Sequence, residues 1–202
     1  MNAGAVAERV HEALRRRILA HGFRPGDRLD PAMLAAELAA SATPVREALF
    51  RLTGEGLVEL RANGGFHLPP LDEPGLRDLY GWSNELLVLA LRHARPPAAI
   101  APPEIADLER SGAERTASLF QAIGDRSRNR EHGAAIAAIN RRLHAVRIVE
   151  PQILAGIDGE LRTIAAQATI GQERSLRRLI AAFHRRRQRA AAQIVRAMYW
   201  RG

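Results

Sequence analysis

The stretch of residues 30–57 is the feature that most constrains the fold of this chain. Two helix starts lie in it, since a capping residue stands directly before a proline at Asp30-Pro31 and at Thr43-Pro44. Behind each start, apolar residues recur at helical spacing, and a short turn at residues 40–42 separates the two runs. The apolar positions are Met33, Leu34 and Leu38 in the first run, and Val45, Leu49 and Leu52 in the second. The pattern predicts a helix-turn-helix whose second helix is held by one face and presents the other outward.

Further elements flank this pair of helices. An earlier helix is predicted from the apolar residues of segment 6–18 and ends at His21-Gly22. After Gly54 and Gly56, two short strands are expected at 57–61 and 66–68, joined by the turn Asn63-Gly64-Gly65. Residues 1–70 are therefore predicted to form a winged helix-turn-helix, with three helices and a two-stranded wing.

Residues 75–202 differ in character from this first part. Long stretches with helical spacing follow one another, separated by prolines and glycines, and no strand is predicted there. The fold class expected for the whole chain is mainly α: the winged helix-turn-helix, then an all-α bundle of five or six helices.

Composition limits the environment and the chemistry. Cysteine is absent, no signal peptide is visible, and the longest strongly apolar run, Leu86 to Leu91, is too short to cross a bilayer. A cytoplasmic protein without a membrane partner is expected. No Gly-rich phosphate loop and no paired-histidine HExxH motif occurs, so no catalytic residues are assigned and the chain is not expected to be an enzyme.

The net charge is +8, and all of the positive charge comes from arginine because the chain has no lysine. Residues 1–70 hold nine arginines against eight acidic residues, and residues 71–202 hold twenty-one against fourteen. The excess lies in the second part, so bulk charge does not locate a DNA-binding site.

The segment LAAELAASATPVREALFRLTGEGL, residues 34–57, resembles the GntR family of bacterial regulators, and within it the FadR-like branch. The preceding loop, Arg24 to Leu29, and the glycine-tipped wing match the same family pattern. The resemblance implies a homodimer that binds a short palindromic operator in double-stranded DNA and acts as a repressor. The chain departs from the family at Ala32, Ala39 and Ala42, where relatives often carry Arg, Gly and Arg.

Six residues are predicted to contact DNA. Arg46 lies in the first turn of the outward face of the second helix, from which an arginine can pair with guanine in the major groove. The others contribute phosphate or wing contacts: Ser41, Thr43, Arg61, Asn63 and Gly64. The alternative is that Arg46 and Arg61 are solvated and that Ser41 and Thr43 are only helix caps.

The resemblance also implies that residues 75–202 form a shortened, FCD-type sensor and dimerisation domain. In that domain a small carboxylate often binds through a metal held by one Asp and three His. The matching positions here are Asn140, His144 and Ala191, and the chain ends before the last, so only His144 remains. No bound metal and no other cofactor is therefore expected.

The last helix suggests another way to hold an acid. His184 and Arg187 interrupt its apolar stripe and, with Asn140 and His144 facing them, are predicted to bind a small organic acid effector. Two alternatives remain open: both residues are core groups with internal partners, or the chain is a constitutive or architectural DNA-binding dimer with a non-functional pocket. A surface for dimerisation is suggested at Tyr80, Trp82, Leu86, Leu87, Leu89 and Ala90, which core packing explains equally well.

Overall fold

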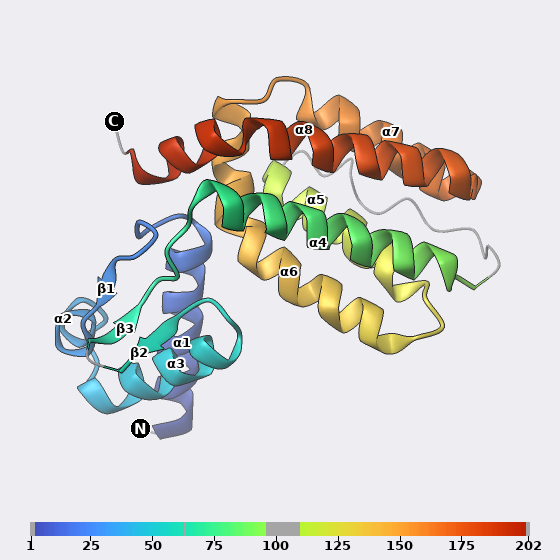
Figure 1. Cartoon of the computed structure of the whole chain (residues 1–202). Coiled ribbons are helices and arrows are strands. Elements are labelled where there is room, and N and C mark those ends of the chain that lie inside the picture. The colour runs from blue at the N-terminus through green and yellow to red at the C-terminus, as the bar shows by residue number, and fades with distance from the viewer. Residues whose placement is uncertain (1–2, 63, 96–109, 201–202) are drawn as a thin grey trace. The chain divides into compact units, whose positions relative to one another are not determined.

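The computed structural model describes residues 3–62, 64–95 and 110–200 (Figure 1). The chain divides into two compact units, Met1–Leu71 and Asp72–Gly202.

The first unit is a helix-turn-helix with a small sheet. Its elements are α1 (Ala3–Leu19), β1 (Arg28–Leu29), α2 (Pro31–Glu37), α3 (Ala42–Gly54), β2 (Glu59–Arg61) and β3 (Gly65–His67). The strands are antiparallel in the order β1-β3-β2, with Leu29 opposite Phe66 and Phe66 opposite Leu60. The predicted fold class is confirmed, but the wing has a third strand. A two-residue strand has no alternation that a sequence pattern could reveal.

Two local predictions in this unit are wrong. Met33 does not belong to the inner face of α2, because its side chain is 66% exposed while Leu34 is buried. Helix α3 begins at Ala42 rather than after Thr43, so Ser41 is the N-cap residue. The first helix start is as expected: the Asp30 carboxylate accepts hydrogen bonds from the amides of Ala32 and Met33.

Contacts with α1 fix the position of α3. The inner face of α3 is buried against the apolar side of α1 in one core. At the rim of that core, Arg51 forms an ion pair with Glu8 at 2.8 Å, and His11 Nε2 lies 2.9 Å from Glu55 Oε1, just after α3. The first helix therefore holds α3 from the side opposite to its exposed face.

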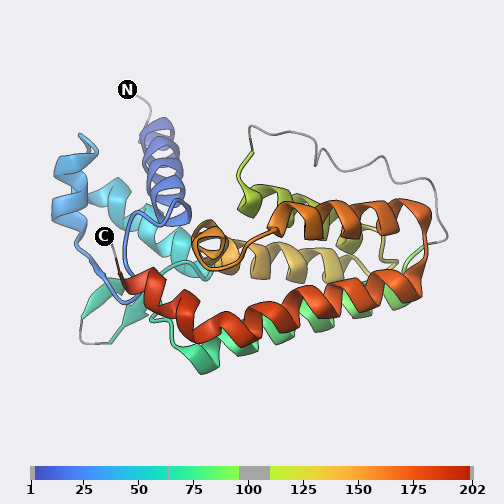
Figure 2. The same cartoon turned by 90° about the horizontal axis from the view of Figure 1, so that it is seen from above.

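The second unit is helical, with α4 (Glu73–Arg92), α5 (Gly112–Asp125), α6 (Arg130–Val149), α7 (Ile157–Ile170) and α8 (Glu173–Tyr199). A short 3-10 turn, η1 (Glu150–Gln152), follows α6. Helices α4 and α8 run side by side in opposite directions in both views (Figures 1 and 2). No helix in the described part of the chain is both long enough and apolar enough to span a bilayer.

A buried network of polar side chains lies among these helices. The Arg187 side chain is fully buried, and its Nε donates to the carboxylate of Glu150 at 2.8 Å. The hydroxyl of Tyr80 donates to the other Glu150 oxygen at 2.7 Å, and Arg187 also reaches Glu160 at 3.1 Å. Charges removed from water must be paired, so this network ties α4, η1, α7 and α8 together.

His184 is the neutral member of the same interior. Its Nδ1 lies 2.8 Å from the Ile180 carbonyl oxygen, which can only accept, so Nδ1 carries the proton. Nε2 then accepts from the Ser83 hydroxyl at 3.0 Å. Burial lowers the pKa of His184 from 6.5 to about 3, because the charged ring would lose its hydration.

The two carboxylates around Arg187 give a matched test of this network. Glu150→Gln is expected to lower the free energy of unfolding by about 3–5 kcal/mol, since it takes the charge partner from a fully buried guanidinium. Glu160→Gln should cost much less, because the Glu160 side chain is 26% exposed and water can replace it. Urea unfolding followed by circular dichroism measures both changes, and equal losses would contradict the assignment of Glu150 as the main partner.

The neutral state of His184 predicts a pH dependence of stability. Between pH 6.5 and about 3 the His184 ring is protonated in the unfolded chain but neutral in the folded chain. The contribution of His184 is therefore complete above pH 6.5, and it is lost progressively as the pH falls through that window. Melting temperatures between pH 4 and 8 are expected to depend less on pH in His184→Gln than in the native chain. Identical slopes would show that His184 is protonated in the folded state as readily as in the unfolded one.

Candidate nucleic-acid interface

The outward face of α3 presents Arg46. Its neighbours Val45, Ala48, Leu49 and Leu52 are buried, whereas Arg46 is exposed in the first turn of the helix. No residue of the described chain forms an ion pair with its guanidinium. An exposed, unpaired arginine at this end of such a helix has the position from which base edges are contacted in the major groove.

Two hydroxyl groups lie at the start of the same helix. Ser41 occupies the N-cap position with extended backbone angles, but its side chain makes no capping hydrogen bond. Thr43 is also exposed, one residue into the helix. The capping explanation therefore fails for the Ser41 hydroxyl, which is available, with the first amides of α3, to accept or donate at a phosphate.

The wing residues are arranged differently from one another. Arg61 is exposed on β2 and pairs with Glu59 at 2.6 Å, so its charge is partly compensated within the strand. Gly64 donates its amide to the Arg61 carbonyl in the turn, and the positive φ of 76° falls on Gly65. The prediction for Asn63 lies outside the described residues. The turn that the sequence predicted is present, and Gly65 is the residue whose backbone requires glycine.

The sequence analysis did not select Arg28, which, like Arg46, lies within electrostatic range of the Asp30 carboxylate. The pKa of the Asp30 carboxyl is lowered, first by the amide of Ala32, then by that of Met33, and to a lesser extent by the charges of Arg28 and Arg46. Both arginines therefore lie within electrostatic range of one carboxylate. Arg28 belongs to the loop, residues 24–29, that carried part of the family resemblance, and this was the available signal.

The four residues predicted to bind an effector all lie in the second unit, three of them buried. Arg187 and His184 share one face of α8, with the internal partners described above. Asn140 on α6 donates to the Ala117 carbonyl and accepts from Arg147 at 2.8 Å. His144, one turn further along α6, is only half-buried.

The positive charge in this interior is compensated by carboxylates of the chain itself, Glu150 and Glu160. Arg147 is buried with Phe120 under its guanidinium, and burial lowers its pKa to about 10. The nearby charge of Glu150 opposes that shift. To bind Arg187, an added carboxylate would have to replace Glu150 or Glu160 as the partner of its guanidinium. Within the described residues, no three His, Asp or Glu side chains gather as metal ligands.

Comparison with known proteins bears on the first unit above all. Residues 6–68 match the family model described as bacterial regulatory proteins, gntR family. The chain is 48% identical over 62 residues to the Nta operon transcriptional regulator of Aminobacter aminovorans. That match spans 31% of this chain and 30% of the length of the relative.

Solved structures resemble more of the chain. A transcriptional regulator GntR from Rhodococcus sp. RHA1 has a TM-score of 0.73 at 19% identity, covering 96% of this chain and 99% of the other. E. coli McbR/YncC has a TM-score of 0.61 at 19% identity, with the same coverage. At this identity the likeness establishes the fold of the chain, while the sequence match establishes the family of its first unit. The chain therefore carries, at residues 6–68, the helix-turn-helix domain of the gntR family of bacterial regulatory proteins.

Proposed function

We propose that this chain is a transcriptional repressor that binds a short palindromic operator as a homodimer. The observation that carries the proposal is the exposed, unpaired Arg46 on a helix whose opposite face is fixed in the core. The free hydroxyl of Ser41 and the glycine-tipped wing support the proposal, because phosphate contacts by these groups would hold the same helix in position on DNA. The relative from Aminobacter aminovorans is described as a regulator of an operon, which agrees with this role.

Dimerisation is part of the proposal, and α4 contributes a candidate surface. Of the six residues that the sequence suggested, Tyr80, Leu86, Leu87 and Ala90 are buried within the unit. Trp82 and Leu89 are 49% and 39% exposed. They lie seven residues apart, two helical turns along one face, and so offer an apolar stripe to a second copy.

Substitution of Arg46 separates base reading from phosphate binding. Arg46→Ala is expected to weaken operator binding by about 1–3 kcal/mol and to blur the preference at one base pair. Arg46→Lys should keep phosphate attraction but lose bidentate pairing with guanine, and so should also reduce discrimination. Fluorescence anisotropy with the operator and with single-base variants measures both effects.

Arg178→Ala is the matched control, because it removes one exposed, unpaired positive charge from α8. It should leave the base preference unchanged. If Arg46→Ala weakens binding to every sequence equally, Arg46 contacts only phosphate.

The effector is the second part of the proposal. A small carboxylate held by Asn140, His144, His184 and Arg187 would modulate DNA affinity by displacing an internal carboxylate. The competing function is a constitutive DNA-binding dimer, and it is favoured by a specific observation: Arg187 is already paired with two carboxylates of the chain, and both ring nitrogens of His184 have internal partners.

A variant that removes the internal pair distinguishes these functions. Glu150→Gln combined with Arg187→Met takes away both buried charges, a change that buried pairs often tolerate. An effector-responsive protein should melt at higher temperature with acetate, pyruvate or lactate, which carry a single negative charge, and the double variant should lose that shift. A constitutive regulator should show no shift with any of the three, in either form.

A further inference from the structure

A small pocket at one end of the second unit is lined largely by arginine. It has a volume of about 220 Å³ and lies between the end of α4, the segment joining α5 to α6, and the start of α8. Its polar lining includes four arginines and one carboxylate: Arg92, Arg95, Arg126, Arg128 and Glu173. The residues of the interior polar network do not line it, so the pocket is a separate site.

The backbone forces two of these arginines together. Ala94 and Ser127 form an antiparallel bridge, which places Arg95 opposite Arg126 and His93 opposite Arg128. The amide of Arg95 donates to the Arg126 carbonyl, and that of Arg128 donates to the His93 carbonyl, each at 2.9 Å. Like charges directly opposite each other on paired strands repel.

Ser127 holds this bridge from inside. It is buried, its hydroxyl lies 2.8 Å from His132 Nδ1, and it accepts the amide of Asn129 at 3.1 Å. The arginine side chains therefore extend from a fixed backbone.

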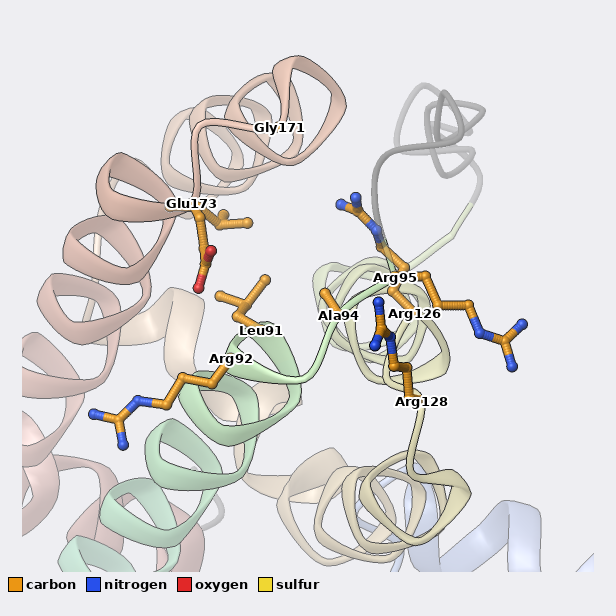
Figure 3. Close-up of a pocket in the computed structure, with 9 residues that line it drawn as sticks. Leu91, Arg92, Ala94, Arg95, Arg126, Arg128, Gly171 and Glu173 are labelled. Atoms are coloured by element: carbon orange, nitrogen blue, oxygen red, sulfur yellow. The ribbon is translucent and has the colours of Figure 1, made fainter.

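No internal carboxylate compensates for this cluster among the described residues. Glu173, on the opposite wall, pairs with Arg177, and Asp125 accepts a hydrogen bond from Gln121 at 2.7 Å. Within the described residues, the Arg126 side chain donates only to the Ala168 carbonyl, at 3.4 Å. Figure 3 shows Arg95, Arg126 and Arg128 leaving adjacent backbone, across from Leu91 and Glu173, while Arg92 extends away from them.

The start of α8 adds a further favourable field. Gly171, Glu173 and Leu176 line the pocket, and no side chain caps the first amides of this long helix. A helix N-terminus attracts negative charge, and here it acts together with the unpaired arginines.

We propose that this pocket binds a compact oxyanion with at least two negative charges, either a phosphate compound or a di- or tricarboxylate. The volume of about 220 Å³ limits the ligand, or the part of it that enters, to a small group. Planar guanidinium groups with several donors match both kinds of oxyanion. The site does not depend on operator binding or on the interior effector residues.

Isothermal titration calorimetry of the full chain with pyrophosphate and with citrate tests the proposal and separates the two sources. Binding is expected for at least one of them. Arg95→Gln combined with Arg128→Gln should weaken it about tenfold or more, since each lost guanidinium removes charge-assisted hydrogen bonds to the anion. Neither side chain has a partner within the described chain, so the variant should fold normally, which its melting temperature checks.

The control removes the same charge elsewhere. Arg185→Gln combined with Arg189→Gln takes two exposed, unpaired arginines from α8 and should leave binding unchanged. Arg46→Ala should likewise leave it unchanged, which excludes anion binding at the DNA-reading helix. Absence of binding by both anions, or equal weakening in the control, would overturn the proposal.

Discussion

Helices of the second unit are organised around one requirement: a guanidinium with no exposed surface must be neutralised inside the protein. Arg187 meets Glu150 from the short turn after α6 and Glu160 from α7, and Tyr80 of α4 completes the hydrogen bonding of Glu150. Each of these partners comes from a different element, so the charge fixes the distance of those elements from α8. His184 is kept neutral one turn away by its burial, and the charges of Arg147 and Arg187 further oppose its protonation.

In the first unit an apolar constraint has the same organising role. Four residues of α3 are inaccessible to solvent, and the ion pairs to α1 lie at the edge of their contact. The direction of the opposite face follows from this packing and from the edge-on contact of Phe50 with Phe66 of β3. Under the proposed function this face is held in position before any DNA is present, so its binding need not include the entropy of ordering a loop.

Sequence reasoning recovered what depends on periodicity and on strong local signals. The apolar repeats located α1 and α3, Asp30-Pro31 located the start of α2, and the glycines located the wing turn. It failed where a local signal had two outcomes: Met33 has the spacing of an inner residue but is exposed, and Thr43 has the chemistry of a cap but lies inside the helix. The pairing of Arg187 with Glu150 and the bridge between Ala94 and Ser127 join residues more than thirty positions apart, and no pattern in a single sequence encodes such contacts.

The inner and outer faces of α3 consist of different side chains, and this determines how such a domain can change by mutation. The residues that hold the helix are not those of the face proposed to meet DNA, and within the described residues neither Arg46 nor the Ser41 hydroxyl makes an ion pair or a capping hydrogen bond. Mutations on the outer side can therefore alter operator preference at little cost to stability. A lineage that duplicates this domain can explore new target sequences on one scaffold, which gives each copy an independent route to a different set of genes.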